Sequence, residues 1–130
     1  MEFSYRHSRL EDENRIVLSA VFSLTEKPTD QIRASMQELM TRRKTSQPLD
    51  LPSAGSAFKR PAQGYAAALI DQAGLKGYRV GDAAVSEKHA GFAVNVGAAT
   101  AKDVRNLLKQ VSNKVFHDTG ICLEPEVRIW

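Results

Sequence analysis

Apolar residues occupy every second position between residues 16 and 24 of this chain. One face of that segment carries five of them: Ile16, Leu18, Ala20, Phe22 and Leu24. Strict alternation of this kind predicts a β-strand, because successive side chains of a strand point to opposite sides. Residues 92–96 alternate in the same way and predict a second strand. Residues 77–85 are interrupted by glycines, which indicates a short strand and a turn.

Elsewhere the apolar residues recur at spacings of three and four, which is typical of amphipathic helices. The first such helix begins near Pro28-Thr29, with Thr29 as its expected N-cap, and ends in the cations of residues 42–44. A short alanine-rich helix is predicted over residues 63–73. Its expected buried side is formed by Tyr65, Leu69, Ile70 and Ala73.

The strongest helix signal follows Thr100, which is expected to be the N-cap, with Asp103 as the acid of a capping box. Gly120 is the expected end of this helix. Its expected core stripe is formed by Val104, Leu107, Leu108, Val111 and Val115. The chain then ends in a predicted strand, with Val127 and Ile129 on one face and the charged residues on the other. Together these elements predict a single α+β domain with a largely antiparallel sheet and about three helices.

The segment between residues 51 and 61 has neither pattern and is predicted to be a rigid loop. It contains a proline near each end and three small residues around Gly55, which favours a tight turn. Ser56 lies there beside two adjacent cations, Lys59 and Arg60. A hydroxyl next to paired cations is typical of a site that holds an anionic substrate while a proton moves. A plain surface turn is the other interpretation of such a segment.

Composition excludes several classes of function. No apolar run is long enough to span a membrane, and the start of the chain has no apolar core of a secretory signal. The single Cys122 excludes an internal disulfide and predicts a cytoplasmic protein. The three histidines are far apart, and no phosphate-binding glycine motif occurs, so we expect neither a metal nor a dinucleotide bound by this chain alone.

The net charge of +3 permits anionic ligands without requiring nucleic acid. Residues 91–96 faintly resemble the strand of an RNA-recognition domain, but Ala93 and Asn95 stand where base stacking needs aromatic side chains. RNA binding is therefore a minor alternative. It would make binding steeply dependent on salt and indifferent to nucleotide sugars.

Three further groups of residues are candidates for binding or catalysis. Lys88 and His89 precede the strand at 92–96, where two donors can grip a phosphate or a carboxylate. The Glu124-Pro-Glu126 sequence places two carboxylates on one face of the last predicted strand. Tyr5-Arg6 places a cation beside an aromatic ring. Each group is also compatible with an ordinary solvated surface.

Taken in order, these pieces resemble one enzyme family. They are residues 3–8 (FSYRHS), residues 52–61 (PSAGSAFKRP), residues 75–77 and 86–92 with Asn95, and residues 123–128 (LEPEVR). Nearly the whole chain is similar to the C-terminal, substrate-binding domain of UDP-N-acetylenolpyruvoylglucosamine reductase, in the shorter of the family's two types. This enzyme acts in bacterial peptidoglycan precursor synthesis.

The resemblance implies a reaction in which NADPH reduces FAD, and the flavin passes a hydride to UDP-N-acetylglucosamine-enolpyruvate to give UDP-N-acetylmuramate. It also implies that Ser56 protonates the enol intermediate, and that Glu126 and Arg6 stabilise it. Tyr5, Lys59, Arg60, Lys88 and His89 become candidates for binding the substrate. Many relatives have Asn in place of Arg60, so the contact of Arg60 does not transfer directly.

The family's FAD-binding region lies N-terminal to the part that residues 1–130 resemble. We therefore expect the isolated chain to retain no flavin and to be inactive, with the missing FAD-binding region as its partner. An independent module that binds nucleotide sugars is the alternative. No membrane and no nucleic acid are expected among its partners.

Overall fold

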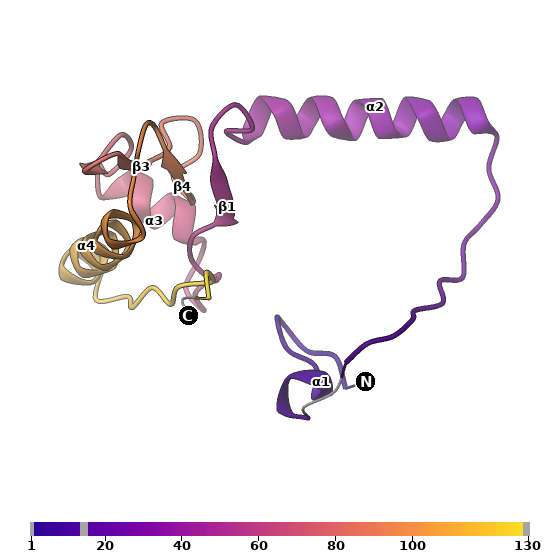
Figure 1. The fold of residues 1–130 in the computed structure, drawn as a ribbon, viewed down its shortest axis with the longest axis horizontal. Coiled ribbons are helices and arrows are strands. Elements are labelled where there is room, and N and C mark those ends of the chain that lie inside the picture. The colour runs from indigo at the N-terminus through magenta and orange to yellow at the C-terminus, as the bar shows by residue number, and fades with distance from the viewer. Residues whose placement is uncertain (1, 14–15, 129–130) are drawn as a thin grey trace. The chain divides into compact units, whose positions relative to one another are not determined.

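The computed structural model describes residues 2–13 and 16–128 and divides the chain into two compact units, Met1–Arg33 and Ala34–Trp130. Each unit is described by itself. The elements of the described residues (Figure 1) are, in order, α1 (Arg9–Asp12), α2 (Thr29–Ser46), β1 (Ser53–Ser56), α3 (Ala66–Gln72), β2 (Arg79–Val80), β3 (Ala83–Val85), β4 (Phe92–Asn95) and α4 (Ala101–Thr119).

The strand predicted over residues 16–24 is wrong, because residues 16–28 belong to no helix or strand. The apolar side chains of this segment are exposed, with Leu18 at 93% and Val21 at 98%. A strand is stable only when a neighbouring strand pairs with its main-chain groups. No described residue provides such a pairing, so the alternating sequence remains extended.

The helix predicted after Pro28 is confirmed as α2, although Thr29 is its first residue rather than its cap. None of the residues of α2 is buried. Ile32, Met36, Leu39 and Met40 lie at helical spacing and are between 42% and 64% exposed. The pattern therefore predicted the helix correctly, whereas burial of its apolar stripe does not occur within the described residues.

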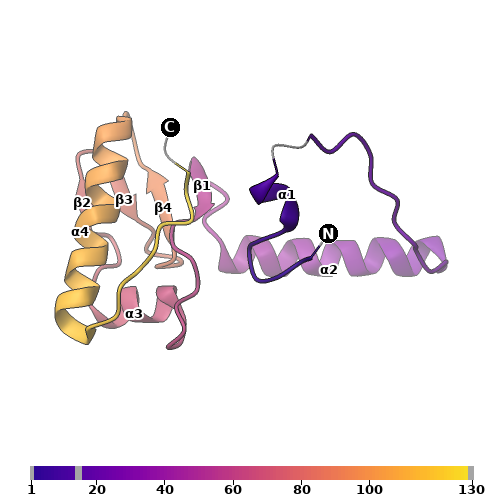
Figure 2. The same cartoon turned by 90° about the horizontal axis from the view of Figure 1, so that it is seen from below.

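The second unit contains a four-stranded, fully antiparallel sheet with the order β1-β4-β3-β2 (Figure 2). This confirms the α+β class and the antiparallel sheet. The glycine-rich segment forms the β2–β3 hairpin, in which Val80 pairs with Ala83 across a two-residue turn. Gly81 has a φ of +59° in that turn, a conformation that glycine adopts without steric cost.

The segment predicted as a loop with no strand contains β1, which forms one edge of the sheet. The register with β4 shifts between Ser53 and Ser56, and Gly55 has a φ of +92° within this irregularity. The Ser53 hydroxyl donates to the Ala93 carbonyl at 2.8 Å and accepts from Gly55 N–H at 3.1 Å. Side-chain hydrogen bonds thus support a strand that its small residues alone do not favour.

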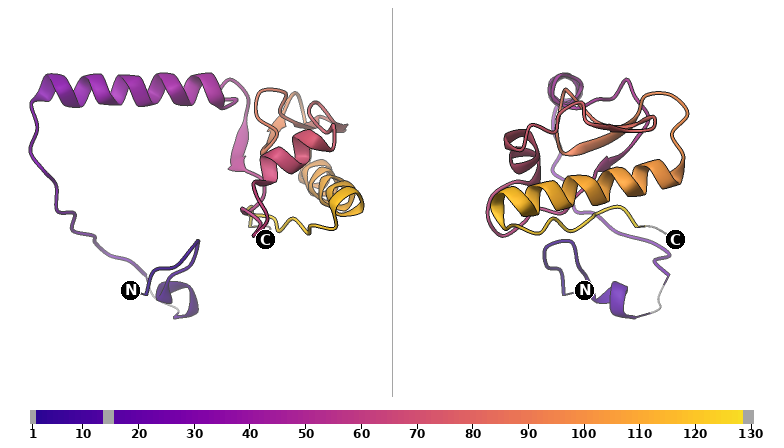
Figure 3. Two further views of the ribbon diagram at one scale, coloured as in Figure 1. Left: turned by 180° about the vertical axis from the view of Figure 1, so that it is seen from behind. Right: turned by 90° about the vertical axis from the view of Figure 1, so that its left-hand side faces the viewer.

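Helix α4 runs along one face of the sheet, where it packs against β2 and β3 and contacts α3 (Figures 2 and 3). Leu107, Leu108, Val111 and Val115 are at most 3% exposed, and Val104 packs against them, so the predicted core stripe is confirmed. The predicted capping box of Thr100 and Asp103 is present, and Gly120 ends the helix with a φ of +72°. The capping box, the terminal glycine and the buried stripe thus all favour the same helix.

Two predictions at the ends of elements are wrong. Helix α3 is shorter than residues 63–73, and its expected core residue Tyr65 is 61% exposed at the N-cap position. The other expected core residues are confirmed, with Ile70 at 1% exposure and Leu69 and Ala73 partly buried against the core. After Gly120 the chain forms no regular strand up to residue 128, and its one ladder contact with the described residues is the isolated bridge between Phe58 and Pro125. Leu123 anchors this segment in the core at 3% exposure. Ile129 lies outside the described residues.

The capping box makes the stability of α4 depend on pH. Hydrogen bonds from the Thr100 backbone and side chain lower the pKa of Asp103. A lowered folded-state pKa stabilises the fold above the unfolded pKa of about 3.9, and this contribution is lost as pH falls through the folded-state pKa. Asp103→Asn should therefore lower the thermal midpoint at pH 7, and the difference from the parent should shrink below about pH 4. Circular dichroism melts across pH measure this.

Asp50→Asn is the matched control, because no hydrogen bond or ion pair of Asp50 occurs within the described residues. A difference between Asp103→Asn and the parent that stays constant from pH 7 to pH 3 would show that the carboxylate charge plays no part in the cap.

Candidate functional site

Ser56 is the last residue of β1 and pairs in register with Phe92, the first residue of β4. Its side chain is exposed, and its hydroxyl donates to the Phe58 carbonyl at 3.2 Å. A serine hydroxyl rotates freely about its C–O bond, so the same proton can instead be directed outward from the sheet edge. The position of Ser56 is therefore fixed by the strand pairing while its proton remains available.

The C-terminal segment brings Glu126 next to this edge. Glu126 N–H donates to the Ala57 carbonyl at 3.0 Å, and Lys59 N–H donates to the Glu124 carbonyl at 2.8 Å. These two bonds flank the bridge between Phe58 and Pro125. Glu126 is half-buried and lies against the residue that follows Ser56. The structure thus joins the predicted hydroxyl and the predicted carboxylate through adjacent main-chain segments.

A third segment, residues 86–91, also contacts the main chain next to Ser56. Ala57 N–H donates to the Gly91 carbonyl at 2.8 Å, so the residue after Ser56 bonds to both neighbouring segments. His89 Nδ1 accepts from Gly91 N–H at 3.1 Å, and the imidazole ring meets the Phe92 ring edge-on at 5.0 Å. The neutral tautomer that satisfies this bond carries its proton on Nε2. His89 therefore holds the backbone that supports Ser56.

Sequence reasoning missed Ser86 as the organiser of this turn. Its side chain is buried, at 4% exposure, and its hydroxyl oxygen accepts from Lys88 N–H at 3.2 Å and His89 N–H at 3.3 Å. A serine followed by polar residues at the start of a turn is a recognised signal for this arrangement. The Ser86-Glu-Lys-His sequence carried the signal, but burial of Ser86 was not visible in it.

The predicted cations near Ser56 each contact a protein group. Lys59 forms an ion pair with Glu124. The Arg60 guanidinium lies 4.1 Å from the centroid of the Tyr65 ring, and its Nε donates to the Gly64 carbonyl at 3.3 Å. Lys88 Nζ donates to the Lys44 carbonyl at 2.5 Å. Binding of an anion by these side chains remains a prediction, and it requires that they exchange these contacts for the ligand.

Tyr5 and Arg6 belong to the first unit, at the tip of a turn. Ser4 N–H donates to the His7 carbonyl at 3.0 Å, and His7 N–H donates back at 3.3 Å. Arg6 has a φ of +57° in this turn, and its guanidinium lies 6.0 Å from the Tyr5 ring centroid. A left-handed conformation at a residue other than glycine costs roughly 1–3 kcal/mol and is frequent at functional positions. The turn is consistent with a specific role for Arg6.

The described residues do not resemble a site for a metal or for a flavin. They contain no group of three or more His, Cys, Asp or Glu side chains that could hold a metal ion. Several glycine turns face a carboxylate, with Glu87 over Gly77, Asp103 over Gly81 and Asp82 over Gly97. A carboxylate at such a turn repels a dinucleotide phosphate rather than cradling it.

Fold and candidate residues together define a small α+β module that presents a hydroxyl, a carboxylate and several cations around one sheet edge. The family model described as UDP-N-acetylenolpyruvoylglucosamine reductase, C-terminal domain, matches residues 47–130. The chain belongs to this family.

Individual relatives agree. A UDP-N-acetylenolpyruvoylglucosamine reductase of Agathobacter rectalis is 54% identical over 129 residues, covering 99% of this chain and 41% of the relative. One of Pseudothermotoga lettingae is 47% identical over 131 residues, covering 100% of the chain and 46% of the relative. The crystal structure of the reductase from Thermus caldophilus superimposes with a TM-score of 0.66 at 44% identity, over 82% of this chain and 38% of that one.

The chain thus spans less than half the length of the curated relatives that it matches. Among the described residues, no helix is long and apolar enough to cross a membrane.

Proposed function

We propose that this chain supplies the substrate-binding and proton-donating part of a reductase that converts UDP-N-acetylglucosamine-enolpyruvate to UDP-N-acetylmuramate. The observation that carries the proposal is the convergence of three segments on Ala57, beside Ser56. Ala57 N–H bonds to Gly91, and its carbonyl accepts from Glu126. The main chain next to Ser56, that of Glu126 and that of the His89 turn are thereby held at one place. The names of the relatives supply the reaction.

The chemistry requires such a set of groups. Hydride addition to the terminal carbon of the enol ether leaves negative charge on the carbon that bears the substrate carboxylate. That charge spreads onto the carboxylate oxygens, where a nearby cation or hydrogen-bond donor lowers the barrier. In its protonated form Glu126 is such a donor, and Arg6 is the cation. A flavin would supply the hydride from outside these residues.

Ser56 completes the reaction by giving its proton to the carbanionic carbon. A hydroxyl is ordinarily a weak acid, but here the acceptor is strongly basic, and the proton travels only one hydrogen-bond length. The exposed position of Ser56 at the sheet edge permits a substrate carbon to approach its oxygen. The serine alkoxide then recovers a proton from solvent, which returns the site to its starting state.

The remaining candidates are assigned to binding. Lys59, Arg60, Lys88, His89 and Tyr5 are proposed to contact the substrate diphosphate or carboxylate, because Arg and Lys pair well with both anions. NADPH and FAD are proposed cofactors of the longer reductase, and its FAD-binding region is the proposed partner of this chain. The proposal places the reaction in the cytoplasm, where the exposed Cys122 remains a free thiol.

Titration of the isotopically labelled 130-residue chain with UDP-N-acetylglucosamine-enolpyruvate tests the proposal by amide NMR. We expect shifts concentrated at residues 55–59, 88–91 and 126. Uridine monophosphate is the control ligand, because it lacks the enolpyruvyl carboxylate and the second phosphate. The absence of shifts at millimolar substrate, both in this chain and in a protein that restores the flavin-binding part, would contradict the proposal.

A further inference from the structure

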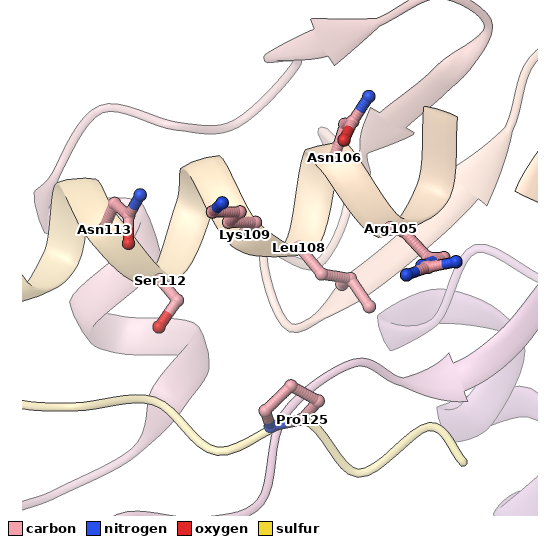
Figure 4. Close-up of a pocket in the computed structure, with 7 residues that line it drawn as sticks. All are labelled: Arg105, Asn106, Leu108, Lys109, Ser112, Asn113 and Pro125. Carbon is pink, nitrogen blue, oxygen red and sulfur yellow. The ribbon is translucent and has the colours of Figure 1, made fainter. Parts of the chain in front are cut away.

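A groove lies between α4 and the C-terminal segment, with Pro125 on one of its walls. Its volume is about 450 Å³, within the range of about 300–1,000 Å³ that is usual for small-molecule sites. In Figure 4, Leu108 and Ser112 point from α4 towards Pro125, and the Arg105 side chain extends at one end of the groove. The residues that line the groove are Arg105, Asn106, Leu108, Lys109, Ser112, Asn113 and Pro125.

The charge of this groove is one-sided. Arg105 and Lys109 lie one turn apart on α4, and no carboxylate is among the lining residues. Neither cation forms a hydrogen bond or an ion pair with another residue in the part of the chain that the structure describes. Like charges four positions apart on a helix repel each other and destabilise the helix. A bound anion between the two side chains would relieve this repulsion.

Several other cations of the second unit differ from this pair. Lys59, Lys76, Arg79 and Lys114 each form an ion pair with a carboxylate within 3.0 Å or less. The acidic residues of α4 are already engaged, since Asp103 bonds to Thr100 and Asp118 bonds to Lys114. No described acid on α4 therefore remains to neutralise Arg105 and Lys109.

The groove also has an apolar part and neutral hydrogen-bonding groups. Leu108 forms the floor of the groove at 3% exposure, and the exposed Pro125 provides the apolar wall next to the cations. The Ser112 hydroxyl donates its proton to the Leu123 carbonyl at 3.1 Å and therefore offers a ligand only an acceptor. The amides of Asn106 and Asn113 retain donor groups. One end of a ligand is thus expected to be anionic and the other apolar.

We propose that this groove binds a small phosphate monoester with a flat apolar body. The phosphate would lie between Arg105 and Lys109, since a guanidinium pairs with phosphate through two parallel hydrogen bonds and an ammonium adds a point charge. The apolar body would lie against the exposed ring of Pro125. Pro125 connects the groove to the bridge with Phe58 next to the Ser56 edge, but none of the residues proposed for the reductase reaction lines the groove. The proposal therefore does not depend on the proposed reductase function.

Phenyl phosphate is the probe, titrated into the labelled 130-residue chain at fixed ionic strength and followed by amide NMR. We expect saturable shifts at residues 105–113, with weaker responses to inorganic phosphate and to phenol, each of which carries only half of the recognised features. The double variant Arg105→Gln/Lys109→Gln should raise the Kd about tenfold or more, because each charged hydrogen bond contributes roughly 1.5–3 kcal/mol. Lys114→Gln, on the same helix but ion-paired, should leave the Kd nearly unchanged.

The substitution Arg105→Lys provides a second measurement, because it keeps the charge and removes the two-bond geometry. Its Kd should lie between those of the parent and the double variant. An unchanged Kd in both variants would overturn the proposal. So would shifts spread equally over all lysines, or shifts that phenyl phosphate and inorganic phosphate produce with the same affinity.

Discussion

A reductase that carries Ser56→Ala is expected to turn over about 10²- to 10⁴-fold more slowly than its parent, the range that general acid catalysis contributes. The protein for this test is a chimera in which this chain replaces the 129 matching residues of the Agathobacter rectalis relative. Alanine removes the proton that Ser56 gives to the carbanionic carbon. It leaves the strand pairing of residue 56 with Phe92 intact, because that pairing uses main-chain atoms. Steady-state oxidation of NADPH measures the loss.

Ser53→Ala is the matched control for this substitution. Ser53 belongs to the same strand, and its hydroxyl serves β1 by bonding to the Ala93 carbonyl. Its loss should lower the free energy of unfolding by about 1 kcal/mol, the typical net value of one hydrogen bond, with little effect on turnover. Equal losses of turnover in the Ser56 and Ser53 variants would show that the hydroxyl of Ser56 only supports the strand.

Glu126→Gln in the same chimera should lower kcat about 10²- to 10³-fold, the cost of removing one preorganised group that stabilises transition-state charge. Glutamine keeps the size of the side chain, and the bond from residue 126 N–H to the Ala57 carbonyl uses only the main chain. KM should therefore change little, because the stabilising contact is made with the charge that develops during the reaction. Initial rates over a range of substrate concentrations separate the two parameters.

Glu124→Gln is the control for Glu126, because it removes a carboxylate two residues away that forms an exposed ion pair with Lys59. Exposed pairs contribute about 0–1 kcal/mol, so this variant should retain nearly parental kcat. A large rise in KM with unchanged kcat for Glu126→Gln would assign Glu126 to substrate binding and contradict its proposed role in the transition state.

Sequence alone predicted the parts of the fold in which local and tertiary signals coincide. Helix α4 combines a capping box, an apolar stripe and a terminal glycine, and each is present in the structure. The alternation at residues 16–24 failed because a strand also needs a pairing partner, which periodicity does not reveal. At β1 the opposite error occurred, because a strand forms where the sequence predicted a loop. The side chain of Ser53 supplies hydrogen bonds that composition does not indicate.

Sequence alone proposed the residues of the candidate site but did not predict how the structure arranges them. Ser56 and Glu126 are far apart in sequence, and only the long-range bonds through Ala57 place them together. The expectation that Tyr65 is buried failed because a residue at a helix N-cap can turn its ring outward to meet Arg60. The left-handed backbone of Arg6 was likewise invisible, since its φ depends on the turn between Ser4 and His7.

The most direct measurement follows the two half-reactions separately in the parent and Ser56→Ala chimeras. Stopped-flow absorbance records reduction of the flavin by NADPH, and then its reoxidation by UDP-N-acetylglucosamine-enolpyruvate. If Ser56 is the proton donor, the first rate remains near the parental value while product formation in the second half-reaction falls steeply. If both half-reactions slow equally, or if the variant forms product at the parental rate, this chain does not donate the proton through Ser56.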